Sequence, residues 1–555
     1  MGNPTNILDL PLEILDLIFN KLSFGNKLKL GQADNILGEA FVYHHRNEYK
    51  KISSRILPLE NWSDFLSICG PIVEEVDVDG LEIQYFKLIE QHCCNLKIIS
   101  KLYMKDFKCS ATRSLFRGAK SLTSLETKIT SDTTAKVIHV LQEATNFKIL
   151  NITYFGEGQD DSSSGVTQRA SSLDLAKIHK LVHLEELTIS SDPFEGSFNI
   201  MHLPSQLKML RFLTFSNIKV NSLIEEVDLT CPALEELNIY SSQIEFQLPF
   251  CPKLRSLKII TSKYSSNNLK WLSKHIVNLE TLQADSKIFQ KNILLSIFSS
   301  KNFKEWEFPK MEQLTINASE IKFPLPFCPR LKSLKLSSTS FFSMNFFFKW
   351  ISKHESTLEE LEITFELFKA NCRLTKLSNI QSQKWTLPSL KKLQISHHLI
   401  SYDLPYCPNL QNLNLEYASC QSMDYFYTWI GKHTNSLECL QLTENLFEET
   451  KFLEILPRCQ KITKFYISTF PKKISFGFLK SFINILKNNG FSSINPFEIR
   501  VPSNEFQHIK RILAVLPNCD LCKCLERRNH FDDLPMDFFD TEDMTDRIQL
   551  ILNNI

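Results

Sequence analysis

The feature that most constrains this chain is a five-residue phrase, Trp-aliphatic-Ser/Gly-Lys-His, that occurs three times. Its tryptophans are Trp271, Trp350 and Trp429, which are equally spaced along the chain. A second phrase, Leu-Pro-aromatic-Cys-Pro-x-Leu-x-x-Leu-x-aliphatic, keeps step with the first and has its cysteines at Cys251, Cys328 and Cys407. Two phrases that recur together over such a period predict a repeat architecture, in which each unit packs on its neighbours.

Each long repeat is itself composite, because it contains three shorter Leu-x-x-Leu-x-aliphatic phrases. In every long repeat, the step from the first phrase to the second is shorter than the step from the second to the third. The phrases begin at Leu234, Leu254 and Leu279, then at Met311, Leu331 and Leu358, and then at Leu390, Leu410 and Leu437. Fainter versions upstream and downstream extend the array over about residues 90 to 490.

A Leu-x-x-Leu-x-Leu phrase has the alternation of a short strand, and the stretch between one phrase and the next leaves room for a helix and two turns. This is the unit of a leucine-rich repeat. The chain resembles the cysteine-containing class of these repeats, because a Cys-Pro pair places a Cys three residues before the first Leu of several phrases. The resemblance implies an α/β fold, a curved solenoid with parallel strands on the concave face and helices on the convex face.

The strand alternation also predicts which side chains leave the core. Leu257 and Ile259 should point inward, and Ser256 and Lys258 outward. The outward positions are polar without a dominant charge, which favours a protein or peptide ligand over nucleic acid, although such a face can also be merely solvated. The candidate substrate-binding residues at these positions are Glu236, Asn238, Ser256, Lys258, Gln283, Thr315, Ser333, Lys335, Glu362, Gln394, Asn414 and Gln441.

The first fifty residues have a different, helical pattern. Pro11 suits the first turn of a helix, with Asp9 as N-cap and Glu13 near the positive helix end. One wide apolar face is predicted for that helix from Ile14, Leu15, Ile18, Phe19 and Leu22. A Gly-Asn turn at 25–26 ends it, and the apolar pattern continues into one or two more helices. Three short helices in about 40 residues are too few to bury a core of their own.

This pattern resembles an F-box, the short helical module that binds the Skp adaptor of cullin-RING ubiquitin ligases. The Leu-Pro-x-Glu-Ile opening at residues 10–14 is its most specific part, whereas the last helix lacks the Trp that many members carry and has His44, His45 and Arg46 instead. The alternative is an ordinary capping helix of the solenoid. The resemblance implies that the adaptor-binding residues are Leu10, Pro11, Glu13, Ile14, Ile18, Phe19, Leu22, Leu28 and Leu30.

Together the two resemblances imply an F-box protein with leucine-rich repeats, the substrate receptor of a Skp–cullin–F-box (SCF) ubiquitin ligase. Such a chain would not itself be an enzyme and would need no cofactor or metal. The expected parts are the F-box at 1–50, a linker or cap at 51–90, the solenoid at 91–490 and a degenerate repeat with an acidic tail at 491–555. The rival interpretation is a leucine-rich-repeat scaffold that acts outside a ligase.

Composition agrees with a protein-binding role. The 63 basic and 62 acidic residues leave no net field to attract nucleic acid or an anionic membrane. Fifteen cysteines are an odd number, and the best-placed ones recur singly within repeats, which predicts reduced, buried thiols in the cytoplasm or nucleus. Neither a signal peptide nor an apolar run long enough to span a bilayer is visible.

Chemistry-bearing motifs are sparse. The common phosphate-binding, acyl-transfer and zinc-protease motifs are missing from the sequence. Cys519, Cys522, Cys524 and His530 have the composition of a metal site, but a terminal degenerate repeat is the simpler interpretation. The histidines of the Trp phrase lie far apart, on successive long repeats, so a repeated structural role is favoured over metal binding. The tryptophans are expected to pack the helices onto the strands.

Two segments stand outside the repeats. Residues 156–168 are rich in Gly, Ser and Asp, which predicts a mobile loop. The acidic stretch from Phe531 to Asp546 is followed by Ile548, Leu550, Ile551 and Ile555. This tail is interpreted either as a short helix that folds back on the solenoid or as a docking peptide.

Overall fold

The protein is described here from a computed structural model, and the chain divides into two compact units, Met1–His275 and Ile276–Ile555. The predicted boundaries at residues 50, 90 and 490 stay predictions. The structure describes residues 6–103, 110–129, 146–155, 173–174, 178, 180–192, 196–199, 207–220, 230–244, 250–260, 271–272, 274–285, 307–321, 325–341, 344–364, 386–396, 399–400, 404–467, 474–491, 497–502, 508–509, 511, 519–520 and 545–552. The predicted loop 156–168 lies outside these residues.

The first unit begins with four helices, α1 (Leu12–Lys21), α2 (Phe24–Ala33), α3 (Asn35–His45) and α4 (Trp62–Cys69). The predicted N-cap Asp9 is wrong, because Asp9 lies in a separate 3-10 turn, η1 (Ile7–Asp9), and Pro11 stands at the cap of α1. Gly31 lets α2 and α3 pack closely, since a Cβ there would lie 3.0 Å from that of Phe41.

The first three helices do not form a core alone. Leu15, Phe19 and Phe41 are buried between them. Phe65 of α4 completes this core, with ring centroids 6.2 Å from Phe41 and 5.0 Å from Tyr49. The first three helices therefore share their core with α4, which leads into the repeats. This agrees with the prediction that three short helices are too few to bury a core of their own.

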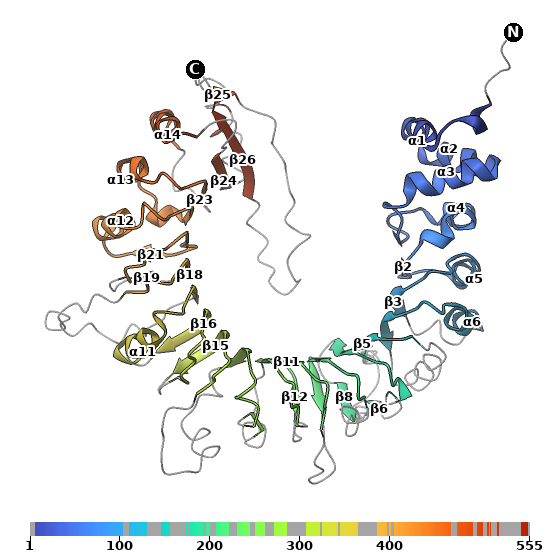
Figure 1. Cartoon of the computed structure of the whole chain (residues 1–555), viewed down its shortest axis with the longest axis horizontal. Helices are drawn as coiled ribbons and strands as arrows, with labels where there is room; N and C mark the ends of the chain where they lie inside the picture. Colours follow the sequence, from blue (N-terminus) through green and yellow to red (C-terminus); the bar gives the residue numbers. More distant parts are fainter. Residues whose placement is uncertain are drawn as a thin grey trace, which may run out of the picture. The chain divides into compact units, whose positions relative to one another are not determined.

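The repeats of the first unit supply one parallel sheet in which each strand pairs with the next in chain order. Its strands are β1 (Lys51–Ile52), β2 (Glu75–Asp77), β3 (Ile98–Tyr103), β4 (Ser124–Ile129), β5 (Ile149–Phe155), β7 (Glu186–Asp192), β9 (Phe212–Ser216), β11 (Glu236–Tyr240) and β13 (Ser256–Ile260). Helices α5 (Ile83–His92) and α6 (Ser110–Gly118) connect the early strands and lie with α4 on one side of them (Figure 1).

The second unit repeats the arrangement. Its parallel strands are β14 (Thr281–Asp285), β15 (Gln313–Ile321), β16 (Ser333–Phe341), β17 (Glu360–Thr364), β18 (Lys392–Ser396), β20 (Asn412–Asn414), β22 (Cys439–Leu442), β23 (Lys464–Ile467) and β24 (Phe497–Pro502). Helices α11 (Met344–Ile351), α12 (Met423–Gly431), α13 (Glu449–Ile455) and α14 (Phe476–Asn488) lie on one side of these strands (Figure 1). Short 3-10 turns occur in both units. Besides η1, those of the first unit are η2 (Leu59–Asn61) and η3 (Gly70–Ile72), and those of the second are η7 (Ser352–His354), η9 (Glu444–Leu446) and η10 (Leu456–Arg458).

Burial alternates along the strands as the Leu-x-x-Leu-x-aliphatic phrase predicts. In β11 and β13, for example, Leu237, Ile239, Leu257 and Ile259 are buried and the residues between them are not. The parallel register pairs Leu237 with Leu257, so successive core residues stack on one another. The leucine-rich-repeat fold and its α/β class are thereby confirmed.

The layer opposite the strands differs from the predicted helices in one stretch. Short segments there form a second parallel sheet, in the order β12 (Gln243–Ile244), β10 (Ile218–Val220), β8 (Gly196–Asn199) and β6 (Leu173–Asp174). The strands β9, β11 and β13 of the first sheet follow one another closely in the sequence. Because so short a repeat leaves little room for a helix and two loops, its return segment is extended. A smaller pair, β19 (Leu399–Ile400) with β21 (Ser419–Cys420), recurs in the second unit.

The C-terminal segment corrects another expectation. Thr545–Leu552 is a strand, β26, that pairs antiparallel with β24 and with β25 (Cys519–Asp520), whereas a helix or a docking peptide was predicted. Ile548 stands opposite Ile499 in this pairing. Because the last parallel strand would otherwise leave backbone groups unpaired, β26 covers that edge of the sheet. The acidic residues 531–544 and the candidate ligands Cys522, Cys524 and His530 lie outside the described residues.

Candidate functional site

The most conspicuous exposed feature of the first unit is an apolar stripe on α1. Helix α1 is apolar on two sides: Leu15 and Phe19 face the core, whereas Ile14 and Leu17 are 42% and 59% exposed. Ile18 is half-buried and continues the outward side at helical spacing. We call Ile14, Leu17 and Ile18 the α1 stripe. Contiguous exposed apolar side chains mark interaction surfaces more often than isolated ones do.

The structure separates the predicted adaptor-binding residues into two groups. Pro11, Glu13 and Ile14 are exposed, and Leu10, Ile18, Leu22 and Leu30 are half-buried. Phe19 and Leu28 are only 0% and 3% exposed, which corrects their assignment to the surface: they hold the module together and cannot contact a partner without unfolding it. The sequence-based list also omitted the exposed Leu12, Leu17 and Ile36. Leu17 was predictable, since it lies one helical turn after Ile14.

Two polar contacts of His44 link α1, which carries the stripe, to α2 and α3. The Nδ1 atom of His44 in α3 lies 2.5 Å from the Oδ1 atom of Asp16 in α1, and its Nε2 atom lies 3.0 Å from the ammonium of Lys27 in α2. Lys27 can only donate, so Nε2 accepts and Nδ1–H donates to the carboxylate. His44 thus bridges two helices at the place where the F-box resemblance lacked its Trp.

The predicted substrate face is a set of straight rows on the strands. In the second unit, the register aligns Gln283, Thr315, Lys335, Glu362, Gln394, Asn414 and Gln441 across seven consecutive strands. In the first unit, Glu236 aligns with Ser256 and Asn238 with Lys258, and Ser333 lies beside Glu360 in the second. None of these candidates is buried, so their outward orientation is as predicted and their binding role stays a prediction.

Ion pairs restrict the two lysines of this face. The Nζ atom of Lys335 lies 2.7 Å from the Glu362 carboxylate, and that of Lys258 lies 3.7 Å from Glu236. Each lysine is therefore balanced by a carboxylate on a neighbouring strand. By contrast, the Oδ1 atoms of Asn238 and Asn414 are buried and accept no hydrogen bond. An unsatisfied buried acceptor costs about 1 to 3 kcal/mol, so these two amides are locally unfavourable positions in the rows.

The strand face of the first unit is less polar than predicted. Ile98, Ile149 and Phe212 occupy the same row as Glu236, and each is half-buried. The ammonium of Lys128 lies 4.9 Å from the ring centre of Tyr103 and 5.0 Å from that of Phe155, which places a cation between two aromatic rings. These residues could have been found by applying the same outward offset to the fainter repeats.

The repeated Trp and Cys phrases interlock, and this explains the composite period. The backbone N–H groups of Cys251, Cys328 and Cys407 donate to the Nε2 atoms of His275, His354 and His433 at 2.9, 3.2 and 3.0 Å. The Nδ1 atom of each histidine lies 2.8 to 3.0 Å from the carbonyl oxygen of the Trp four residues earlier. Each imidazole is therefore neutral, with its proton on Nδ1.

We call the turn at which each of these cysteines donates to its histidine a corner. The equivalent corner of the preceding repeat is closed by hydrogen bonds between backbone groups alone. There, the N–H groups of Cys231, Phe308 and Leu387 donate to the carbonyl oxygens of Phe250, Phe327 and Tyr406. The third repeat of each set offers an imidazole in place of that carbonyl. The three repeats are thus chemically distinct, and the long period of the Trp and Cys phrases follows from that difference. The histidines have the structural role predicted for them.

Tryptophan secures the same corner from the helix side. The Nε1–H groups of Trp350 and Trp429 donate to the carbonyl oxygens of Pro326 and Pro405, both at 2.8 Å. All three tryptophans of the phrase are buried, in agreement with their predicted packing role. The Cys-Pro pairs begin tight turns, since Leu331 and Leu410 donate their N–H groups to the carbonyl oxygens of Cys328 and Cys407 at 3.0 Å.

Burial tunes the protonation of these groups. Desolvation lowers the pKa of His354 from 6.5 to about 4 and also lowers the pKa of His433. Burial raises the pKa values of the Cys328 and Cys407 thiols to about 12, so both remain protonated and unreactive at neutral pH. These cysteines and Cys231 and Cys251 are buried, as predicted, and form no disulfide with another described residue.

Two further kinds of feature are missing from the described part of the chain. No group of three or more His, Cys, Asp or Glu side chains among the described residues is arranged to hold a metal ion. Within the same residues, no helix combines the length and apolar character needed to cross a bilayer.

Comparisons with known proteins find likeness only among solved structures. No family model matches it, and no curated protein matches it in sequence. Solved structures that resemble it include an internalin, InlF, from Listeria monocytogenes (13% identity, TM-score 0.32, 82% of this chain and 93% of that one) and the mouse RP105/MD-1 complex (14%, 0.36, 71% and 70%). A plant peptide hormone receptor, RGFR1, in complex with RGF2, also matches (12%, 0.28, 69% and 60%). The assignment of the fold rests on the strand register and burial above.

A leucine-rich-repeat array exposes one long face of its strands. Its strands present aligned rows of side chains, and its stability depends on contacts between neighbouring repeats rather than on any one surface residue. The outward rows therefore contribute less to the stability of the array than the buried positions do.

Proposed function

We propose that this chain is the substrate-recognition subunit of an SCF-type E3 ubiquitin ligase. The observation that carries the proposal is the α1 stripe: a short helical module at one end of a repeat array leaves Ile14 and Leu17 in solvent while burying Leu15 and Phe19 on its other side. A helix that serves only as a cap would need one apolar side and not two.

In this proposal, each part of the chain has one task. The helices α1–α3 hold a Skp-family adaptor and, through it, a cullin. The strand rows hold a protein substrate, and ubiquitin transfer takes place on other subunits. The chain contributes proximity, because tethering raises the effective concentration of a substrate lysine near the reactive thioester. It would be a non-catalytic subunit, without cofactor, that works in the cytoplasm or the nucleus.

The proposed substrate is a protein or a peptide. The second unit offers a polar row that runs from Gln283 to Gln441, with Lys335 and Glu362 already paired in it. That balance of charge supports neither nucleic acid nor a membrane surface as partner.

A second candidate is a scaffold that acts outside a ligase. The same α1 stripe favours it, because an exposed aliphatic stripe can dock against any amphipathic helix and does not specify the adaptor chemically. The two candidates differ in one respect: only the first requires that the stripe capture a Skp adaptor and a cullin.

The deciding experiment is co-purification of the full chain with a Skp adaptor and a cullin. In the test variant, Ile14→Asp and Leu17→Asp place two charges on the stripe without touching the core. We expect capture to weaken at least about 30-fold, because two aliphatic side chains contribute about 2 to 3 kcal/mol when a partner buries them. The matched control, Gln91→Glu with Gln421→Glu, adds the same charge at exposed positions outside α1–α3 and should bind normally.

Point variants suit this test better than deletion of the first fifty residues. Deletion would uncover Phe65 of α4, which is fully buried and packs against Phe24 and Phe41 of the deleted segment. Loss of binding could then reflect aggregation. If the unaltered chain captures neither adaptor nor cullin, the ligase proposal fails and the scaffold remains.

A further inference from the structure

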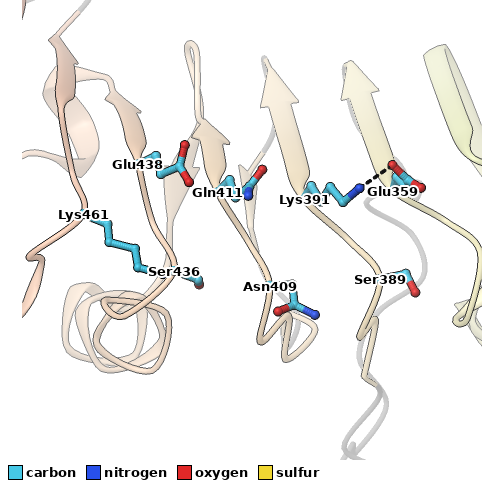
Figure 2. A pocket seen from close by; sticks show the side chains of 8 residues that line it. All are labelled: Glu359, Ser389, Lys391, Asn409, Gln411, Ser436, Glu438 and Lys461. Atoms are coloured by element: carbon cyan, nitrogen blue, oxygen red, sulfur yellow. Dashed lines mark hydrogen bonds and ion pairs between the residues drawn. The ribbon is translucent and has the colours of Figure 1, made fainter.

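The second unit has a polar groove that lies beside the strand rows, at the rim where the strands begin. It has a volume of about 390 Å³ and is lined by Glu359, Ser389, Lys391, Asn409, Gln411, Ser436, Glu438 and Lys461. Figure 2 shows these side chains along successive repeats, with Glu438 and Gln411 in the middle and Lys461 toward one end. The groove is separate from the outward strand positions considered above.

A backbone ladder explains why these side chains form a row. Lys391 donates its N–H group to the carbonyl oxygen of Glu359, Gln411 donates to Lys391, and Glu438 donates to Gln411, each at 2.8 Å. Each of these four residues immediately precedes a strand. Their spacing is therefore that of neighbouring parallel strands, about 5 Å.

Charge on this rim is usually balanced between neighbours. Lys391 pairs with Glu359 at 2.8 Å, and Lys332 pairs with Glu312 at 2.9 Å. In the first unit, Arg211 pairs with Glu235 at 3.0 Å in the same way. Gln411 interrupts this pattern, because the neutral amide stands where a cation would neutralise Glu438. The structure gives the Glu438 carboxylate no ion pair with a described residue.

Three other polar side chains of the groove use a hydrogen on a backbone carbonyl and keep an oxygen as acceptor. Ser389 donates its hydroxyl to the carbonyl oxygen of Ser356 at 2.8 Å, and Ser436 donates to that of His433 at 3.2 Å. The side-chain amide of Asn409 donates to the carbonyl oxygen of Pro388 at 2.8 Å. The two serine hydroxyl hydrogens and one N–H of Asn409 are thereby used, so the serine oxygens and the Asn409 amide oxygen can act as acceptors.

We propose that this groove binds an arginine side chain of an extended protein segment. The guanidinium pairs with the Glu438 carboxylate, and its remaining N–H groups donate to the amide and hydroxyl oxygens along the row. Arginine suits the groove better than lysine, because its five donors are spread over a plane and can reach several separate acceptors. The site goes beyond the proposed ligase role, since it requires no adaptor and lies off the strand face.

The two lysines that line the groove differ in how strongly they repel a bound guanidinium. Lys391 is neutralised by Glu359, so it opposes a bound cation weakly. Lys461 has no such partner among the described residues and repels the guanidinium. Removal of Lys461 should therefore strengthen binding, whereas removal of Glu438 should weaken it. A nonspecific polar surface would not give these opposite signs.

The experiment is saturation-transfer NMR on the full chain with N-acetylarginine amide as probe. N-acetylcitrulline amide, the neutral analogue of the same shape, is the control ligand. We expect Glu438→Gln to weaken arginine binding about five- to tenfold, as expected for loss of one charge-assisted pair. Lys461→Met should strengthen it. Glu312→Gln, a paired rim carboxylate outside the groove, should leave it unchanged.

Each outcome decides the proposal. Discrimination against citrulline, loss with Glu438→Gln and gain with Lys461→Met together would establish the site. Equal binding of arginine and citrulline, or equal binding by the Glu438→Gln and Glu312→Gln variants, would overturn it. Because no adaptor is present, failure here leaves the ligase proposal intact, and failure of adaptor capture leaves this site intact.

Discussion

Replacement of Trp429 with alanine is expected to lower the free energy of unfolding by about 3 to 5 kcal/mol. The indole is only 3% exposed, so its removal leaves a large cavity between α12 and the strands. It also leaves the carbonyl oxygen of Pro405 without its donor and removes the ring that lies 4.5 Å from the His433 ring. Both effects weaken the corner at which Cys407 meets His433.

Urea denaturation followed by circular dichroism measures this loss. The matched control is Phe476→Ala, which removes an aromatic side chain that is 48% exposed at the start of α14 and should cost no more than about 0.5 kcal/mol. If the two variants were equally stable, the tryptophan would not hold the helix layer on the strands, and the account of the repeated corner would be wrong.

Acidification is expected to destabilise the same corners. His354 is neutral in the folded protein with a pKa of about 4, but in the unfolded chain it takes up a proton below about pH 6.5. Its contribution to stability is therefore complete above pH 6.5 and is lost as the pH falls toward 4. The loss from His354 alone is about 3 kcal/mol at pH 4, and His433 adds to it in the same direction.

The measurement is the free energy of unfolding at several pH values between 7 and 4. Its slope with pH reports the protons taken up on unfolding. We expect the variant His354→Gln to show a shallower slope in this interval by up to one proton, because glutamine does not titrate. An unchanged slope would mean that His354 is protonated in the folded state, and Nε2 would then be unable to accept from Cys328.

Much of the fold was predictable, because the alternation of apolar and polar residues along each strand phrase predicts which side chains are buried. The phrases beginning at Leu254 and Leu331 specify buried and outward positions directly, and the structure places them so. The return segments were less predictable. Whether residues 218–220 form a helix or a strand depends on the length of the repeat and on the neighbouring segments 196–199 and 243–244, with which they pair.

The candidate sites, too, were predictable in part from the sequence and in part only from the packing. The Leu-Pro opening led to the proposed adaptor-binding module, and that role stays a proposal. The predicted residues mixed Phe19 with Ile14, because both are large and apolar and only the packing of α3 decides which side of α1 is covered. The rim groove has no signature in the sequence. Glu438 resembles any other charged residue before a strand until the register puts Gln411 beside it.

The sequence by itself determined the repeat period, the residues that point into the core and the three-repeat grouping marked by the Trp and Cys phrases. These follow from local preferences and from a pattern that recurs along the chain. Only the tertiary structure decided that the His354 imidazole accepts from the Cys328 backbone, that β26 covers the edge of β24 and that Glu438 has no counter-ion among the described residues. Each of these depends on which residues from different repeats lie side by side, and burial and hydrogen bonding settle that when the chain packs.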